Sequence, residues 1–333
     1  MKDMAKAGFL KINAIGDTIL LTAPILDLKE RYPDIHLTLF TGTDNYETAT
    51  LIEGVDKIIR LPLSNINETI RLIKNEGGFD FWIDFGPWPR INALLTHLAR
   101  ADFKIGFRTE GQYRHYIYDQ AIPHSALHHE VCNYKRLLEP LSIAGSHMPR
   151  IGSSHPNMEK DLVTIQMYPG GTRSYLKEWP EENWISIIEE LQKKGYFIYL
   201  TGSRTDRPRA EELRKRLRSD NRVKVVAGQY SIGETASLIT QSKLVITVNT
   251  GILHLASALD CSVVSLNGPT STVRWGSLNN RSISLRSHLS CSPCLNLGFE
   301  YGCNENKCMQ SITVREVQDA VFRLVCNAAD SKQ

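Results

Sequence analysis

The chain has 333 residues, which is enough for two domains of ordinary size. Hydrophobic residues make up 42% and charged residues 23%, as in globular proteins with buried cores. The formal net charge is only +3 and no Lys/Arg run is interleaved with aromatic residues, which argues against nucleic acid as a partner. No apolar run reaches the ~20 residues of a membrane span, and the N-terminus lacks the apolar core of a signal peptide. We therefore expect a cytoplasmic protein.

The first part of the chain alternates segments typical of strands and helices. Strands are predicted at 9–12, 36–40, 56–61 and 79–85, and helices at 18–31, 66–76 and 92–99. Repeated β–α units of this kind predict a parallel, doubly wound sheet.

A segment rich in Ser, Gly, Pro and His, between about residues 140 and 161, interrupts this pattern and is the best candidate for a linker. After it, strands are predicted at 162–167, 197–201, 223–227, 245–248 and 262–266, and helices at 181–194, 206–217, 232–240 and 252–259. We therefore predict two α/β domains, 1–150 and 151–333, each Rossmann-like and facing the other across a cleft.

The first predicted strand ends in a turn at Ala14–Asp17. Gly16 permits close approach of the backbone, and Asp17 lies at or near the start of a helix. One interpretation is that Asp17 only caps this helix, and the other is that it is a general base at the carboxyl edge of the sheet. The dinucleotide fingerprint GxGxxG is absent from both domains, which disfavours a nicotinamide-dependent dehydrogenase.

A glycine-containing loop also follows the first strand of the second domain. Gly170, Gly171 and Thr172 offer backbone and hydroxyl donors, with Arg173 and Lys177 close by in sequence. Such a loop can hold a diphosphate, because the two cations offset its charge. The alternative is a flexible loop with two solvated bases.

Two later strands of the second domain end in polar loops. The first ends in Asn249, Thr250 and Gly251, and His254 lies one turn into the helix that follows. The second ends in a loop at 267–270. Because parallel strands end at the same edge of a sheet, these loops predict a site for a phosphorylated ligand.

The densest basic run of the chain, residues 214–218, follows Glu211 and Glu212 at helical spacing. This pattern is more typical of a solvated helix face than of a binding patch. A modest attraction to anionic lipid headgroups is also compatible with it.

Four of the seven cysteines lie close together in the sequence: Cys291, Cys294, Cys303 and Cys308. Their arrangement, CX2CX8CX4C, is typical of a closed four-thiolate site for zinc or iron, with a structural role because no ligand position stays open. Free core thiols and disulfides are the alternatives. Cys132, Cys261 and Cys326 are scattered singly, and we expect them in the core.

Five blocks together resemble the family 9 glycosyltransferases, whose best-known members are the ADP-heptose:lipopolysaccharide heptosyltransferases. The blocks are Ile15-Gly16-Asp17 to Pro24; Phe79 to Gly86 with Ile105-Gly106-Phe107; Pro169-Gly170 through Lys177 to Pro180; Thr201-Gly202-Ser203; and Asn249 through His254 to Gly268-Pro269-Thr270. They occur in the order of the family and span residues 9 to about 320.

The resemblance implies a GT-B fold, with the acceptor bound mainly by the first domain and the nucleotide-sugar by the second. It implies an inverting transfer that needs no metal for catalysis, with Asp17 at the position of the catalytic base. From the loops and the resemblance together we expect the donor at Thr172, Arg173, Lys177, Asn249, Thr250, Gly251 and His254. Family members usually carry Asp where this chain has Asn249, so a sugar other than heptose is an alternative to the default.

The partners that the resemblance implies are ADP-heptose and an acceptor glycan or glycolipid such as the lipopolysaccharide core. An enzyme of this kind would associate at most peripherally with the cytoplasmic face of the inner membrane. Related protein-modifying heptosyltransferases hold iron with clustered cysteines, which resembles the segment 291–308. Two rival interpretations are a nucleotide-sugar epimerase, which shares the two-domain scaffold, and a non-catalytic nucleotide-sugar-binding protein.

Overall fold

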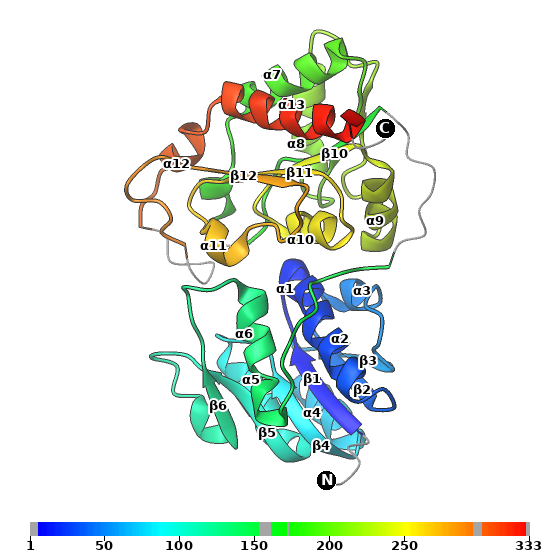
Figure 1. Cartoon of the computed structure of the whole chain (residues 1–333), viewed down its shortest axis with the longest axis vertical. Coiled ribbons are helices and arrows are strands. Elements are labelled where there is room, and N and C mark those ends of the chain that lie inside the picture. Colours follow the sequence, from blue (N-terminus) through cyan, green and yellow to red (C-terminus); the bar gives the residue numbers. More distant parts are fainter. Residues whose placement is uncertain (1–5, 153–160, 172, 296–301, 331–333) are drawn as a thin grey trace. The chain divides into compact units, whose positions relative to one another are not determined.

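The computed structural model describes residues 6–152, 161–171, 173–295 and 302–330 (Figure 1). The chain divides into two compact units, Met1–Gly152 and Ser153–Gln333. Each unit contains one six-stranded parallel sheet. The fold is therefore α/β in both halves, as the alternating sequence pattern predicts.

The sheet of the first unit has the strand order β3-β2-β1-β4-β5-β6. Its strands are β1 (Lys6–Lys11), β2 (His36–Thr41), β3 (Lys57–Arg60), β4 (Gly78–Asp84), β5 (Arg100–Arg108) and β6 (Gln120–Pro123). The chain changes direction across the sheet between β1 and β4, which pair in parallel with Leu10 opposite Asp84. Ligands of open α/β sheets bind at the carboxyl ends of strands beside such a switch point. The loops after β1 and β4 are thus the expected place for a site.

The helices of this unit form two contacting pairs, α2 with α6 and α4 with α5. The helices of the first unit are α1 (Ile15–Leu20), α2 (Thr22–Arg31), α3 (Tyr46–Ala49), α4 (Ile66–Asn75), α5 (Arg90–Leu98), α6 (Glu130–Arg136) and the 3-10 turns η1 (His115–Ile117) and η2 (Glu139–Leu141). Under α4 and α5, the rings of Phe40 and Phe79 pack on Trp82, which is fully buried. Aromatic packing of this kind fixes β4 beneath its helices.

The single helix predicted at 18–31 is two helices in the structure. α1 ends at Leu20, α2 begins at Thr22, and the N–H of Leu21 donates to the carbonyl of Thr18. Pro24 lies in the first turn of α2 and has no N–H to donate to a preceding carbonyl, so the helical ladder is interrupted there. Since α1 begins at Ile15, Asp17 lies inside a helix rather than ahead of one.

The sheet of the second unit has the order β12-β11-β10-β7-β8-β9 and is likewise parallel. Its strands are β7 (Leu162–Gln166), β8 (Phe197–Thr201), β9 (Val223–Val225), β10 (Leu244–Val248), β11 (Val263–Asn267) and β12 (Ser282–Arg286). Counted along the chain, this is the same order as in the first unit, and the switch point lies between β7 and β10. The loops after β7 and β10 carry the donor-binding residues predicted from the sequence.

Figure 1 shows α7, α8 and α13 on one face of this second sheet and α9 and α10 on the other. The elements are α7 (Glu181–Lys193), α8 (Arg207–Lys215), α9 (Ile232–Gln241), α10 (Gly251–Ala258), α11 (Thr272–Trp275), α12 (Lys307–Gln310), α13 (Val314–Asp330) and the 3-10 turn η3 (Ser174–Lys177). α13 crosses β10, β11 and β12 and packs against α7. Trp179 and Trp184 are buried beneath these helices, with ring centroids 5.0 Å apart.

Three strands are absent from the elements predicted above: β5, β6 and β12. β6 and β12 lie at the edges of their sheets, and the first half of β5 is only partly buried. A partly buried strand needs few apolar residues, so its sequence shows little of the alternation that marks a strand.

The segment predicted to be a linker is partly fastened to the first unit. Asp27 Oδ1, on α2, accepts hydrogen bonds from the backbone N–H groups of Ser146 and His147, each at 2.9 Å. Thr22 Oγ1 accepts another from the N–H of Arg150 at 3.0 Å. The segment up to Arg150 is therefore a strap along α2, not a free connection.

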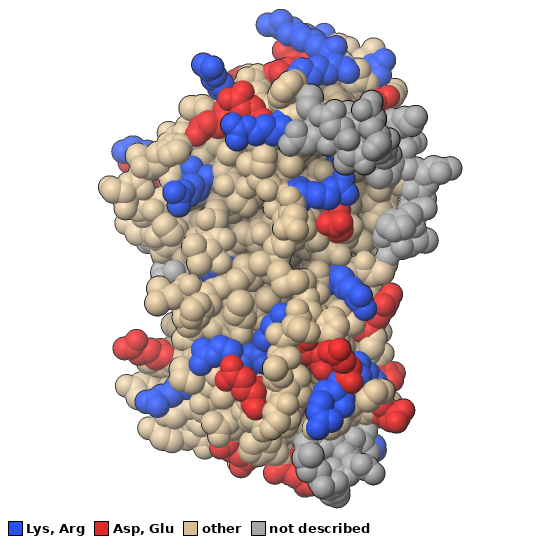
Figure 2. All heavy atoms as spheres, in the orientation of Figure 1, with Lys and Arg blue, Asp and Glu red and all other residues tan. Residues whose placement is uncertain are grey.

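The basic run 214–218 lies on and just after α8, and its cations pair with carboxylates. The pairs are Arg214–Glu211, Lys215–Glu212, Arg216–Glu181 and Arg218–Glu189. On the face shown in Figure 2, Lys and Arg are interspersed with Asp and Glu. The interpretation of this run as a solvated helix face is confirmed.

In the part of the chain that the structure describes, we find no helix both long enough and apolar enough to span a bilayer.

Candidate active site

Asp17, the predicted catalytic residue, lies in the first turn of α1, directly after β1. The N-cap of α1 is Ala14, and no side chain caps this helix, so the capping role considered for Asp17 is wrong. Instead, Asp17 Oδ2 accepts a hydrogen bond from Lys11 Nζ at 2.6 Å, within an ion pair. The Lys11 side chain is 1% exposed and that of Asp17 is 19% exposed. Asp17 is thus an accessible carboxylate with one oxygen bound to a buried cation.

Lys11 is the last residue of β1 and is otherwise surrounded by the interior of the first unit. Its ammonium lies 5.4 Å from the centroid of the Tyr134 ring, a cation–π distance. A buried ammonium is costly unless a carboxylate compensates its charge. Lys11 and Asp17 therefore depend on each other for their positions.

Asn45, which is fully buried, joins the chain segments on either side of this ion pair. Its Nδ2 donates to the Lys11 carbonyl at 2.9 Å and to Thr18 Oγ1 at 2.7 Å. Its Oδ1 accepts from the N–H of Gly42, after β2, at 2.9 Å. One side chain thus holds the carboxyl ends of β1 and β2 to α1.

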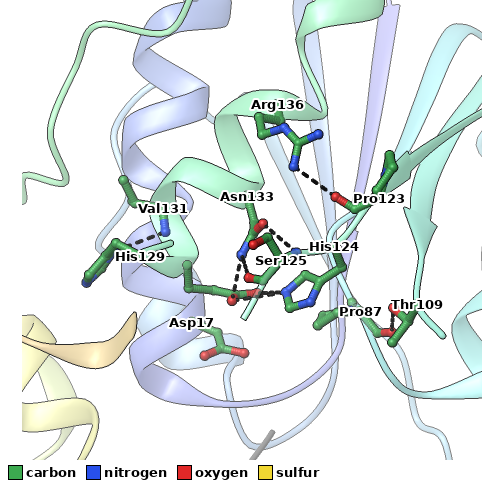
Figure 3. A network of polar contacts seen from close by, with 12 residues as sticks. Asp17, Pro87, Thr109, Pro123, His124, Ser125, His129, Val131, Asn133 and Arg136 are labelled. Atoms are coloured by element: carbon green, nitrogen blue, oxygen red, sulfur yellow. Dashed lines mark hydrogen bonds and ion pairs between the residues drawn. The ribbon is translucent and has the colours of Figure 1, made fainter. Parts of the chain in front are cut away.

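A second polar network lies where β6 leads into α6 (Figure 3). His124 Nε2 contacts both carboxylate oxygens of Glu130, at 3.0 and 3.1 Å, and Asn133 Nδ2 donates to the same carboxylate. Asn133 also binds the backbone of Ser125 on both sides of its amide. α1 contacts α6, so this rigid corner forms part of the surroundings of Asp17.

The carboxyl end of β4 carries a third buried group. Asp84 Oδ2 accepts hydrogen bonds from Arg114 and from the Tyr118 hydroxyl, and Oδ1 accepts from Asn92 and from the N–H of Gly86. Burial and the nearby Asp84 charge raise the pKa of Tyr118 well above its usual range, so it stays a donor. Because every oxygen of Asp84 is bound, this group shapes the loop and is not a candidate base.

In the second unit, the loop after β7 carries the predicted diphosphate-binding residues. Thr172 lies outside the described residues. Lys177 Nζ, in η3, donates to the Gly170 carbonyl at 3.2 Å, and burial lowers the pKa of its ammonium. Arg173 has a left-handed backbone (φ 53°) and donates to the Cys303 carbonyl at 2.6 Å. Lys177 is therefore aimed at the glycine loop, whereas Arg173 ties this loop to the cysteine-rich segment.

The loop after β10 leads into α10, which begins at Gly251. The Thr250 hydroxyl caps α10 by accepting from the N–H of Ile252 at 3.2 Å. His254 is buried and packs edge-on against Trp275, with ring centroids 6.1 Å apart. The start of α10 carries the positive end of the helix dipole, which favours a negatively charged ligand at this loop.

Asn249, where the family usually carries Asp, turns its amide N–H groups inward. Nδ2 donates to Asn267 Oδ1 at 2.8 Å and to the Trp275 carbonyl at 3.1 Å. Asn267 is itself oriented by its own Nδ2, which donates to the carbonyls of Ser265 and Leu285. Asn249 thus offers a ligand only the acceptor Oδ1, as an aspartate oxygen would.

The four clustered cysteines do not all share one environment. Cys308 is buried, Cys294 is half-buried, and Cys291 and Cys303 are exposed; all four are free thiols. Burial raises the pKa of Cys308 to about 11, with a further contribution from the neighbouring Cys294 and Cys303. No disulfide joins the six cysteines whose pairing is described.

The two other described cysteines differ from each other. Cys261 is buried, as predicted for an inert core thiol, and burial raises its pKa to about 11. Cys132 is exposed, so its predicted place in the core is wrong. It lies on α6, which packs on the sheet by its other side. The side chain of Cys326 lies outside the described residues.

The segment around these cysteines contacts two loops at the carboxyl edge of the second sheet. Besides Arg173, the Pro269 carbonyl accepts from the N–H of Cys294 at 3.0 Å, and the N–H of Gly268 lies 3.1 Å from Met309 Sδ. Asn306 Nδ2 also donates to the Glu178 carbonyl, just after η3. Contacts to the loops after β7 and β11 make the segment a structural part of the donor side.

Among the described residues, three possible metal ligands lie within 4.8 Å of one another only at Asp27, Glu30 and His147. Asp27 Oδ1 already accepts from two backbone N–H groups, and His147 Nδ1 lies 2.8 Å from the same oxygen. These contacts hold the segment up to Arg150 against α2, which explains why the three side chains lie together. None of the three is a cysteine: in the described residues, no three of the thiols of Cys291, Cys294, Cys303 and Cys308 lie within 4.8 Å of one another, and the metal site expected at 291–308 stays a prediction.

Sequence reasoning missed Lys11, Asn45 and the Asp84–Arg114–Tyr118 group. A signal for Lys11 was present, because a lysine directly follows the buried run Ala7–Leu10 and precedes Asp17 by six residues. Such a lysine must find a carboxylate nearby. Asn45 and Arg114 lie in loops whose partners are distant in sequence, and nothing local marks them.

Two sheets with the same strand order, each with polar loops at its switch point, define a two-domain α/β protein of the GT-B class. The family model of Glycosyltransferase family 9 (heptosyltransferase) matches residues 76–305. The chain therefore belongs to glycosyltransferase family 9, as its ordered motifs predict.

Individual relatives agree with this assignment. Lipopolysaccharide heptosyltransferase 3 of Escherichia coli K12 is 27% identical over 288 residues, covering 78% of this chain and 81% of the relative. Lipopolysaccharide heptosyltransferase 1 of Pseudomonas aeruginosa is 32% identical over 126 residues, 38% of this chain and 34% of the relative. The match to that relative and to two further ones spans about a third of their length, 34% to 36%. The solved structure of E. coli ADP-heptose LPS heptosyltransferase II shares the fold, with a TM-score of 0.80 at 17% identity over 97% of this chain and 99% of that one.

The inward amide of Asn249 predicts that Asn249→Asp destabilises the second unit. A carboxylate would place its oxygens against Asn267 Oδ1 and the Trp275 carbonyl, leaving acceptors that face only acceptors. The expected cost is about 1–3 kcal/mol, measurable as a Tm several degrees lower in thermal unfolding. Asn280→Asp, at an exposed position, is the matched control and should leave Tm unchanged. Equal Tm values for the two variants would show that the amide of Asn249 is not needed as a donor.

Proposed function

We propose that this protein is an inverting glycosyltransferase that transfers a sugar, heptose from ADP-heptose, to a lipopolysaccharide-core or other cell-surface glycan. The observation that carries the proposal is which residues lie in the loops at the two switch points. The first unit holds an accessible carboxylate, Asp17, after β1. The second unit holds a glycine loop with the cation of Lys177 after β7, and a polar loop that leads into α10 after β10. A carboxylate can take the proton of an acceptor hydroxyl, and the loops of the second unit can stabilise a leaving diphosphate.

In the proposed reaction, Asp17 takes the proton of an acceptor hydroxyl as its oxygen attacks the anomeric carbon of the donor sugar. The bond between that carbon and the diphosphate oxygen breaks, and ADP leaves with the electron pair. The products are the glycoside, ADP and protonated Asp17, so atoms and charge balance. Attack opposite to the leaving group inverts the anomeric centre.

The second unit supplies the groups that stabilise the leaving diphosphate. Lys177 brings a cation to the glycine loop, and the start of α10 brings N–H groups beside Thr250 and Gly251. These fixed donors can offset the developing charge, so a divalent ion is not required for this role. Thr172 and His254 complete the donor side in this proposal, Thr172 through its hydroxyl and His254 through its packing on Trp275.

ADP-heptose is the donor that the comparisons favour. A heptosyltransferase of the same fold has been solved with ADP-2-deoxy-2-fluoro heptose. Because Asn249 presents only an acceptor oxygen to a ligand, the difference from the usual aspartate is no argument against a heptose donor. We place the enzyme in the cytoplasm, where a glycolipid acceptor would bring it to the inner face of the membrane.

The cysteine-rich segment is proposed to hold a structural zinc or iron ion. An iron-containing glycosyltransferase, TibC, shares the fold with a TM-score of 0.63. Four thiols close together in the sequence are a donor set for soft metals, and Cys294 and Cys303 lie near enough to Cys308 to raise its pKa. Bound metal would stabilise the contacts of this segment with the donor loops and would take no part in the transfer.

The test of the proposed function is a panel of nucleotide-sugars offered with core oligosaccharide, with products identified by mass. We expect ADP-heptose to give an acceptor that is heavier by one heptose, together with ADP. Conversion of the donor without acceptor would identify an epimerase instead. Tight ADP binding with no transfer from any donor would identify a non-catalytic binding protein.

Replacing Asp17 should abolish sugar transfer and leave the affinity for ADP unchanged. Asp17→Asn keeps the size of the side chain but cannot take a proton, so kcat should fall by about 10²-fold or more. The Kd for ADP, measured by calorimetry, should be unchanged because the donor loops lie in the other unit. Asp56→Asn, which removes another lysine-paired carboxylate of the same unit, is the control. Normal turnover by Asp17→Asn would remove Asp17 from the mechanism.

Nucleotide binding should weaken as pH rises. Burial lowers the pKa of Lys177, so its cation is lost at a lower pH than that of an ordinary lysine, and its attraction to the diphosphate is lost with it. We expect the Kd for ADP to rise roughly tenfold between neutral pH and about pH 10. Lys177→Arg, which stays charged, should keep the affinity flat, and Lys193→Arg should behave as the wild type. A flat profile in the wild type would mean that Lys177 does not bind the diphosphate.

The metal proposal is tested by elemental analysis of purified protein. We expect zinc or iron at about one ion per chain, lost in a Cys294→Ser/Cys303→Ser double variant, together with weaker ADP binding. Cys132→Ser, which removes an exposed thiol of the first unit, should change neither quantity. Metal-free wild-type protein with full ADP affinity would argue for free thiols.

A further inference from the structure

The ammonium of Lys11 lies against Asp17 but is too deeply buried to reach a substrate, since its side chain is 1% exposed. We propose that Lys11 is the positioning residue of the catalytic base: it binds Oδ2 of Asp17 and leaves Oδ1 as the atom that takes the proton. This inference rests on the proposed function, because it concerns the same carboxylate.

The two oxygens of Asp17 have different surroundings. Oδ2 accepts the 2.6 Å hydrogen bond from Lys11 Nζ. Within the described residues Asp17 makes no other side-chain hydrogen bond, and Oδ1 is not among the buried polar atoms that lack a partner. Since the side chain is 19% exposed, Oδ1 is the oxygen open to a ligand.

Lys11 is itself held in place, as a positioning group must be. β1 pairs with β2 up to the position of Lys11, opposite Thr41. Asn45 binds the Lys11 carbonyl, and the ammonium lies over the Tyr134 ring. A lysine on a surface moves through many rotamers, whereas this one has its backbone and its ammonium fixed. It can therefore fix the direction of the Asp17 side chain.

The competing explanation is that the pair only neutralises a buried charge. The same unit offers a comparison, because Lys29 Nζ pairs with Asp56 at 2.7 Å, with side chains 21% and 38% exposed. The Lys29–Asp56 pair lies at the opposite end of the sheet, where β3 begins, and stabilises the fold there. Lys29→Met is therefore a matched control for the loss of a lysine–aspartate pair.

The kinetic test is a double-mutant cycle of Lys11→Met and Asp17→Asn, read as kcat with saturating donor and acceptor. Methionine keeps the length and apolar bulk of the lysine stem. We expect Lys11→Met to lower kcat by about 10²-fold, with the Kd for ADP unchanged, because a misplaced reacting group costs this much. In the Asp17→Asn background, Lys11→Met should have no further effect. Lys29→Met should keep kcat within about twofold of the wild type.

Two results of this cycle would overturn the proposal. One is a full multiplicative loss from Lys11→Met in the Asp17→Asn background, since Lys11 would then act independently of Asp17. The other is normal kcat in Lys11→Met. Lys11→Gln, which keeps an N–H donor, is made in parallel and should retain more activity than the methionine variant. Failure of both variants to fold would identify Lys11 as a residue of the fold and would also overturn the proposal.

A crystal structure of Lys11→Met supplies a readout that does not depend on transfer. We expect the Asp17 carboxylate to leave its wild-type position or to occupy several, with β1 and α1 unchanged. An Asp17 side chain in its original place would show that Lys11 does not position it. If the wild-type protein transfers no sugar, the proposed function is wrong. The crystal structure of Lys11→Met would still show whether Lys11 orients Asp17.

Discussion

Buried charge must be paired, and in this protein that requirement shapes the carboxyl edge of the first sheet. The two strands that flank the switch point end in charged residues, β1 in Lys11 and β4 in Asp84. The ion pairs that these residues form, Lys11–Asp17 and Asp84–Arg114, differ in their exposure. Asp84 is enclosed by four hydrogen bonds and becomes part of the scaffold. Lys11 has a partner that remains open to solvent, and this difference separates the carboxylate that we propose as the base from the structural one.

The second unit uses the same strand order for another purpose. At its switch point, the loop after β7 brings Lys177 to the Gly170 carbonyl, where the first unit has the buried ammonium of Lys11 paired with Asp17. Amide side chains take the structural part there, with Asn249 and Asn267 in a chain of hydrogen bonds whose direction is set by backbone carbonyls. In our proposal, one topology thus supports a base in one unit and an anion site in the other, because different residues follow the strands.

Much of this could be predicted from the sequence, because apolar runs with β-branched residues mark central strands and glycine-containing polar loops mark their carboxyl ends. That reasoning located Asp17 and Lys177 and the two sheets, and the order of the motifs gave the family. It failed where information is not local. The first helix begins at Ile15, so Asp17 lies inside it, and it breaks before Pro24. Asn45 and Arg114 act on residues 34 and 30 positions away. The orientation of the Asn249 amide depends on three other segments and leaves no trace in its own sequence.

The strap along α2 has a consequence for where the first unit ends. Asp27 is 2% exposed, and the donors that its Oδ1 accepts come from residues 146 and 147. A chain cut ahead of these residues would remove the donors of Asp27 and expose the part of α2 that they cover, which would destabilise the first unit. The natural point of separation is therefore after Gly152, where the compact unit ends, and the strap is better regarded as the last edge of the first domain than as the beginning of the connection to the second.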